Sequence, residues 1–145
     1  GNALHQFLHV DDAALAFAGV LGRKACIGQT YNMVRRGFTT WAEHHRTAMR
    51  VIGREVELVG VPFVDLAAWN IPAFEICETI FRHHVVYDAE RLRRDVPEFQ
   101  PRVSLEQGMR EVLAAMDAAG KIPDSDAVRW EDEIIAAQRK VRPRA

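Results

Sequence analysis

The chain has 145 residues, of which 48% are hydrophobic and 27% charged, enough for one domain with a core of fair size. Its net charge of −1 argues against a general surface for nucleic acid or anionic lipid, and no apolar run approaches the ~18 residues of a membrane span. The two cysteines, Cys26 and Cys77, fit no metal spacing. We expect buried free thiols and a cytoplasmic protein without a signal peptide.

The first third of the sequence predicts two strands with a helix between them. Residues 4–10 are rich in β-favouring side chains, and Asp11 or Asp12 is suited to cap a helix over 12–23. Gly28 interrupts the helical pattern. Residues 29–34 then predict a second strand, followed by a turn at 35–38.

The middle third predicts a well-capped helix and a broken one. Thr40 followed by Glu43 has the form of a capping box, and the helix it begins is expected to end at Gly53. Residues 56–61 alternate like a strand. Residues 63–81 are apolar and mostly helical in pattern, with a break expected at Pro72. Residues 83–87 again favour a strand.

The last third is predicted to be helical. Asp88 is suited to cap a short helix through Arg94, and Ser104 opens a second capping box whose helix ends at Gly120. Residues 121–125 form a linker and 126–141 a last helix. We therefore expect a helix-rich α+β fold with short strands, a substrate-binding domain over 1–120, and a linker with a C-terminal helix and basic tail over 121–145.

Five motifs follow one another in an order that resembles a known family. They are Phe7-Leu8-His9-Val10-Asp11-Asp12, Gly28-Gln29-Thr30-Tyr31-Asn32, Thr40-Trp41-Ala42-Glu43, Asp88-Ala89-Glu90-Arg91-Leu92-Arg93-Arg94-Asp95 and Phe99-Gln100-Pro101-Arg102-Val103-Ser104-Leu105-Glu106-Gln107-Gly108. Each motif alone is weakly specific. Together, over about residues 5–115, they are similar to the C-terminal half of extended short-chain dehydrogenase/reductase proteins, the NAD-dependent epimerase/dehydratase family.

The resemblance implies that this chain is the substrate-binding half of a longer enzyme. The parent would bind NAD or NADP on an N-terminal Rossmann domain, and the first residue, Gly1 rather than Met, is expected to follow such a missing part. Its substrate would be a sugar nucleotide or a related hydroxyl or carbonyl compound. The chain has no glycine-rich cofactor turn. Arg35 and Arg91, not lysine, stand four residues after Tyr31 and Tyr87. We expect no catalytic and no cofactor-binding residue here.

Four residues are candidates for substrate contact by resemblance: His5, Phe7, Arg82 and His83. His5 stands where nucleotide-sugar members carry an arginine, and a histidine lacks the arginine fork, which argues against a nucleotide diphosphate. Arg82 is the best candidate for an anionic contact. The structural alternatives stay open: a surface histidine for His5, a core ring for Phe7 and a solvated helix end for Arg82.

Other polar residues are assigned to structure. His9 is expected to tie a strand end to neighbouring backbone, while Asp11 or Asp12 caps the helix. No triad with ligand spacing is visible, so no metal site is expected. Trp41, Trp69 and Trp130 are expected to anchor separate helices.

The rival hypothesis is a free-standing, non-catalytic module for binding a small molecule or a protein. The mass of the intact protein distinguishes it from half of an enzyme. Nucleic-acid binding is disfavoured by the charge balance. For the isolated chain we expect neither NAD binding nor turnover, and a homodimer formed through the 29–34 strand edge or the first helix.

Overall fold

The structure, a computed structural model, describes residues 1–69, 71 and 74–141. It is a helix-rich α+β chain, as the sequence predicts. Its small antiparallel sheet pairs β1 (Leu4–His5) with β2 (Thr39–Thr40), in the register Leu4 to Thr40 and His5 to Thr39. The helices are α1 (Val10–Val20), α2 (Trp41–Ile52), α3 (Phe63–Leu66), α4 (Glu90–Asp95), α5 (Leu105–Ala118) and α6 (Trp130–Val141), with shorter turns at Lys24–Cys26, Cys77–Phe81 and Ser125–Ala127.

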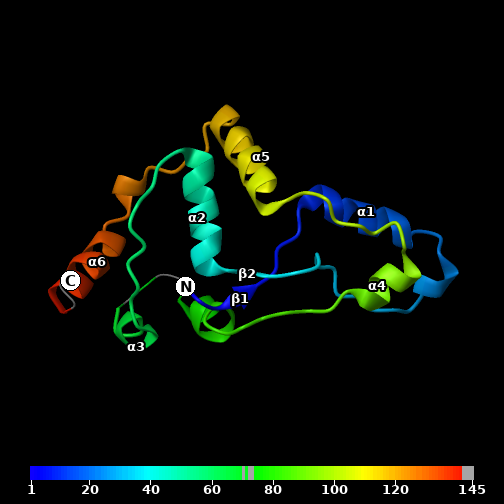
Figure 1. The fold of residues 1–145 in the computed structure, drawn as a ribbon, viewed down its shortest axis with the longest axis horizontal. Coiled ribbons are helices and arrows are strands. Elements are labelled where there is room, and N and C mark those ends of the chain that lie inside the picture. Colours follow the sequence, from blue (N-terminus) through cyan, green and yellow to red (C-terminus); the bar gives the residue numbers. More distant parts are fainter. Residues whose placement is uncertain (70, 72–73, 142–145) are drawn as a thin grey trace.

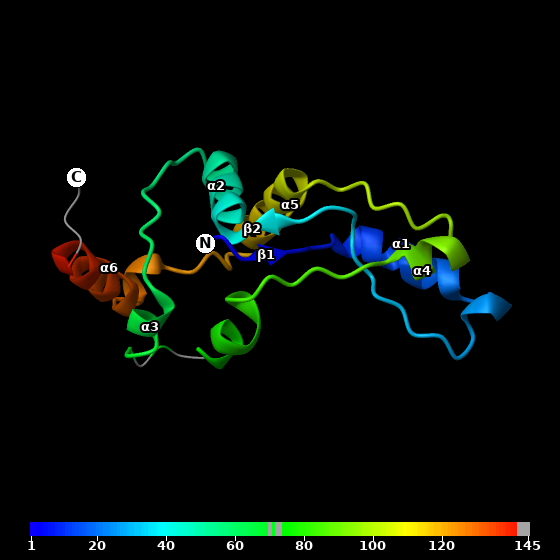
Figure 2. The ribbon, with the colours of Figure 1, turned by 60° about the horizontal axis from the view of Figure 1, so that its bottom comes forward.

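The elements form an elongated arrangement joined by long connections. Figure 1 shows α1 and α4 together at one end, α2 and α5 in the middle and α6 at the other end, and Figure 2 shows the same order after rotation. The best-buried cluster lies between α1 and α4, where Ala16, Ala89, Leu92, Val96 and Phe99 meet. The sheet lies between this end and α2.

The capping predictions of the central helices are confirmed. The Thr40 hydroxyl accepts the backbone N–H of Glu43 at 3.1 Å, and Gly53 ends α2 in the left-handed region at φ 71°. The Ser104 hydroxyl accepts the N–H of Gln107 at 3.1 Å at the start of α5. Short polar side chains at these positions satisfy N–H groups that the first helical turn leaves free.

The cap predicted for the first helix is wrong. α1 begins at Val10, and its cap is His9, whose Nδ1 accepts the N–H of Asp11 at 3.3 Å. The two aspartates lie inside the first turn of α1 instead of before it. The helix therefore starts two residues earlier than predicted, because the histidine ring performs the task expected of a carboxylate.

Three predicted strands are wrong. Residues 29–34, 56–61 and 83–87 form no strand. In the first segment, Tyr31, Met33 and Val34 pack against the core between α1 and α4. Its polar contacts run through side chains, as where the Asn32 amide donates to the Asp88 carbonyl at 3.2 Å. The apolar residues of this segment are therefore partly buried against the core, although its backbone pairs with no other strand.

The C-terminal helix is shorter than predicted. α6 begins at Trp130, after a turn at Ser125–Ala127, and Arg139 pairs with Glu57 at 3.0 Å. The break expected at Pro72 lies outside the described residues, as does the end of the basic tail.

Candidate functional site

A small hollow lies beside the sheet, where β1 meets the start of α2. The pairing of Leu4 with Thr40 places His5 next to Trp41, and their rings stack 4.0 Å apart at 13°. The Phe81 ring lies 4.8 Å from the Trp41 ring. These aromatic side chains, with His83 and Tyr87, line a hollow of about 210 Å³. We call it the His5–Trp41 pocket.

The His5 ring brings unsatisfied polar atoms to this pocket. Both of its nitrogens are buried, and neither has a hydrogen-bond partner among the described residues. Burial lowers the pKa of His5, and the nearby His45 lowers it further. His44, on the next turn of α2, has its pKa lowered by burial and then by His5 and His45. A neutral imidazole has one donor and one acceptor, and in this structure protein atoms cover both.

The segment after Phe81 closes one side of the pocket because it bonds to β1. The Leu4 N–H donates to His84 Nδ1 at 3.1 Å, and the Val85 N–H donates to the Leu4 carbonyl at 2.9 Å. His84 is thereby used for structure while His83 lines the pocket. The two adjacent histidines therefore have different roles.

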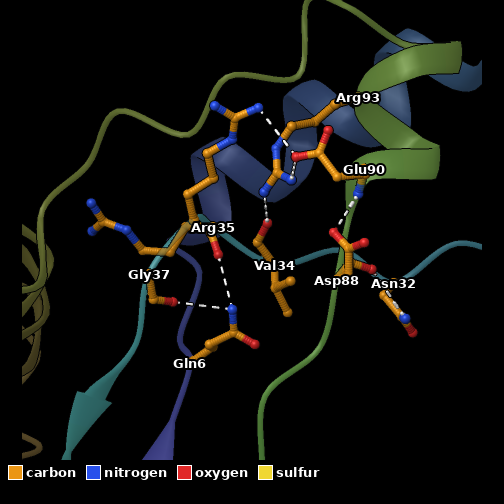
Figure 3. Close-up of polar contacts among 9 residues, drawn as sticks. Gln6, Asn32, Val34, Arg35, Gly37, Asp88, Glu90 and Arg93 are labelled. Atoms are coloured by element: carbon orange, nitrogen blue, oxygen red, sulfur yellow. Dashed lines mark hydrogen bonds and ion pairs between the residues drawn. The ribbon is translucent and has the colours of Figure 1, made fainter.

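Gln6 fastens three segments together at the edge of the pocket. Its Nε2 donates to the carbonyls of Arg35 and Gly37, each at 3.1 Å, as Figure 3 shows. Its Oε1 accepts the Tyr87 N–H at 2.7 Å. The amide therefore fixes the 35–37 turn and the 82–88 segment relative to β1.

The structure brings two of the four predicted contact residues together. His5 and His83 line the same pocket. Phe7 lies outside it, between a hollow of about 300 Å³ and the groove between α2 and α5, with the Arg35 guanidinium 5.5 Å from its ring. Arg82 also lies outside it. Its guanidinium packs 4.6 Å over the Phe63 ring, and its Nε donates to His83 Nε2 at 3.0 Å.

Tyr31 bonds to α4 and packs against the core. Its hydroxyl donates to Asp95 at 2.8 Å. A hydrogen bond with the Cys26 thiol, then desolvation and the bond to Asp95, raise the pKa of Tyr31 above its usual value. The Arg91 guanidinium lies 5.7 Å from the ring centre. Tyr31 therefore joins the core to α4.

A cluster of possible metal ligands lies elsewhere, at the start of α1. Ligand atoms of His9, Asp11 and Glu111 lie within 4.8 Å of one another, which the sequence spacing did not predict. His9 Nδ1 already accepts the Asp11 N–H, and its Nε2 lies 3.2 Å from Glu111. Both ring nitrogens therefore have partners, and we interpret the cluster as a helix cap with a close contact between His9 and Glu111.

The sequence interpretation missed the aromatic wall of the pocket. From the sequence, Trp41 is expected only to anchor a helix, Tyr87 is considered only as a possible catalytic tyrosine, and Phe81 is not singled out. The capping box located Trp41 at the first position of α2, but only the pairing of β1 with β2 brings it onto His5.

No family model matches this chain, and neither a curated protein nor a solved structure is significantly similar to it. Within the described part of the chain, each helix is too short or too polar to cross a bilayer.

Proposed function

We propose that this chain is the substrate-binding half of an NAD(P)-dependent epimerase, dehydratase or reductase of the extended short-chain type. The observation that carries the proposal is that the motifs behind the resemblance contact one another. Asp12 of the first motif accepts N–H groups from Arg102 and Val103 of the last. Asn32 of the second donates to Asp88 of the fourth.

The His5–Trp41 pocket is the proposed contact region for the substrate. Its volume of about 210 Å³ is below the ~300–1,000 Å³ of ordinary ligand pockets, which suits a site completed by another domain. Aromatic walls and a neutral His5 favour contact with the sugar ring or carbon skeleton of the substrate, and any charged part of the substrate would lie outside the pocket.

A Rossmann domain outside these residues would hold NAD or NADP in this proposal. The sequence has neither the glycine-rich turn nor a Tyr-x-x-x-Lys pair. The cofactor would supply hydride transfer. The residues of this chain would orient the substrate and exclude water from it. Val10 and Phe17 on α1 and Leu21 directly after it are 72%, 63% and 79% exposed, so an apolar stripe is open to a second domain.

An amide-resolved NMR titration tests the proposal. UDP-glucose is added to the ¹⁵N-labelled chain, and NAD is added to a second sample. We expect UDP-glucose to shift the signals of His5, the Trp41 indole and His83, and NAD to shift none. His83→Ala should reduce those shifts, whereas Arg46→Ala, at an exposed position of α2, serves as the control.

The proposal fails if UDP-glucose leaves the pocket signals unchanged or if NAD binds with a dissociation constant below ~10 µM, which needs about 7 kcal/mol of specific contacts. If glucose alone shifts only the signals of pocket residues and NAD shifts none, the free-standing binding module is favoured instead.

A further inference from the structure

A second hollow, separate from the His5–Trp41 pocket, is lined by four arginines. Arg35 and Arg36 come from the turn after the 29–34 segment, and Arg93 and Arg94 come from the last turn of α4. The hollow has a volume of about 570 Å³, and the buried Phe99 ring forms part of its wall. We call it the arginine hollow. The whole chain carries a net charge of −1, so this concentration of positive charge is local.

Two of these arginines are held in place by backbone carbonyls. Arg93, whose side chain is only 14% exposed, donates to the Val34 carbonyl at 3.4 Å. Arg35 donates to the Val103 carbonyl at 3.0 Å. Figure 3 shows the Arg93 side chain reaching from α4 toward the Val34 carbonyl. Guanidinium groups fixed in this way keep their remaining N–H donors in place without losing further side-chain freedom on binding.

Glu90 is the sole carboxylate among the residues that line the arginine hollow. It lies 3.2 Å from Arg36 and 2.9 Å from Arg93, so one anion already bridges the two guanidiniums. Asp95 pairs with Arg94 at 3.0 Å. Arg35 forms no ion pair with any carboxylate in the described part of the chain. Positive charge therefore remains in excess after the internal pairs are made.

We propose that the arginine hollow binds the phosphate group of a small molecule, with Arg36 and Arg93 as its main ligands and Glu90 as an internal competitor. A phosphate dianion has more charge and more acceptor oxygens than the Glu90 carboxylate, so it is the ligand class able to replace it. This proposal uses other residues than the pocket and stands apart from the proposed function.

Calorimetric titration of the 145-residue chain at low ionic strength, with inorganic phosphate and with glucose 6-phosphate, tests the site. We expect saturable binding in the millimolar range. Glu90→Gln should tighten it roughly fivefold, because one negative charge beside the ligand is removed. Arg36→Gln should weaken it about tenfold through the loss of a charge-assisted contact. Arg36 is 74% exposed, so its replacement leaves the packing intact.

Glu98→Gln is the matched control. Glu98 is 63% exposed, close to the 61% of Glu90, and pairs with Arg23 at 2.7 Å outside the hollow. The Glu98→Gln substitution should leave the affinity for both phosphate compounds unchanged. Tighter binding in Glu90→Gln cannot arise from unfolding. The proposal is overturned if neither compound binds saturably, or if Glu90→Gln and Glu98→Gln behave alike. A preference for glucose 6-phosphate identifies an ester as the ligand, and equal affinities identify the free ion.

Discussion

Asp12 accepts the backbone N–H of Val103 at 3.0 Å and that of Arg102 at 2.9 Å, across some ninety residues of sequence. The aspartate is 3% exposed and lies in the first turn of α1, while Val103 precedes α5. One buried carboxylate thus joins the α1–α4 end of the molecule to the segment that enters the α2–α5 pair.

The Asp12→Ala variant should lose about 3 kcal/mol of unfolding free energy. It removes two hydrogen bonds to a charged acceptor and leaves two backbone donors unpaired in a buried place. Urea denaturation followed by circular dichroism measures the loss. Asp11→Ala is the control, because the Asp11 side chain is 80% exposed and its removal should cost under ~0.5 kcal/mol. Equal losses in the two variants would contradict the assigned role.

The Gly19→Ala variant should be destabilised by about 1–3 kcal/mol. Alanine normally favours a helix over glycine by ~1 kcal/mol. At Gly19, however, an added Cβ would lie 2.3 Å from Val96 Cγ1, and Val96 is fully buried between α1 and α4. Thermal unfolding measures the change.

Two further variants isolate this contact. Gly60→Ala should be neutral or slightly stabilising, because a Cβ there meets nothing within 4 Å. The double variant Gly19→Ala with Val96→Ala should be more stable than the sum of the single changes predicts, because the second substitution removes the clash. Strict additivity would show that the contact with Val96 is not the cause.

Local signals in the sequence predicted the helices well and the long-range contacts poorly. The caps at Thr40 and Ser104 depend on residues three positions apart, and both were correct. The contact of Asp12 with Val103 depends on chain segments whose meeting no local pattern specifies. The 29–34 segment is predicted to be a strand, whereas its residues Tyr31, Met33 and Val34 are partly buried against the core without a partner strand.

The candidate pocket was predictable only in part for the same reason. The resemblance selected His5 and His83, which line the same pocket, and also Arg82, which packs on Phe63 instead. Nothing in the sequence indicated that Trp41 would stack on His5, because that contact follows from a sheet of two residues per strand.

The stability of the chain should fall as the pH is lowered from 7.5 to 5. Burial lowers the folded-state pKa of His5 and His44 below the ordinary value of 6.5. Below that pH the unfolded chain therefore binds more protons than the folded chain, and unfolding is favoured. The contribution of the two neutral histidines to the free energy of unfolding is complete above pH 6.5 and declines as the pH falls below that value.

Urea midpoints across this pH range provide the measurement. The carboxylates with lowered pKa values, Asp95, Glu98 and Glu106, titrate in the folded state below this window. His44→Gln should show a smaller fall than the wild-type chain, because one of the two histidines is gone. An identical fall in both proteins would argue against His44 as a source.

The isolated chain should self-associate through the outer face of α1. Val10, Phe17 and Leu21 lie on one stripe and are 72%, 63% and 79% exposed, while the buried Asp12 and Ala16 lie on the opposite side of the helix. The 29–34 segment, the other predicted contact, packs inward and forms no strand edge. An apolar stripe of this kind is most simply covered by a second copy around a two-fold axis.

Light scattering at micromolar concentration measures this association, and we expect a dimer mass. Phe17→Glu should weaken the dimer by about 100-fold, the equivalent of the 2–3 kcal/mol gained by burying a phenylalanine side chain. Val64→Glu is the control, because Val64 is 76% exposed on α3, away from α1. If the wild-type chain is a monomer, the apolar stripe on α1 stays exposed to solvent without a partner. The open apolar face would then no longer support a missing second domain, and the free-standing module would become the better hypothesis.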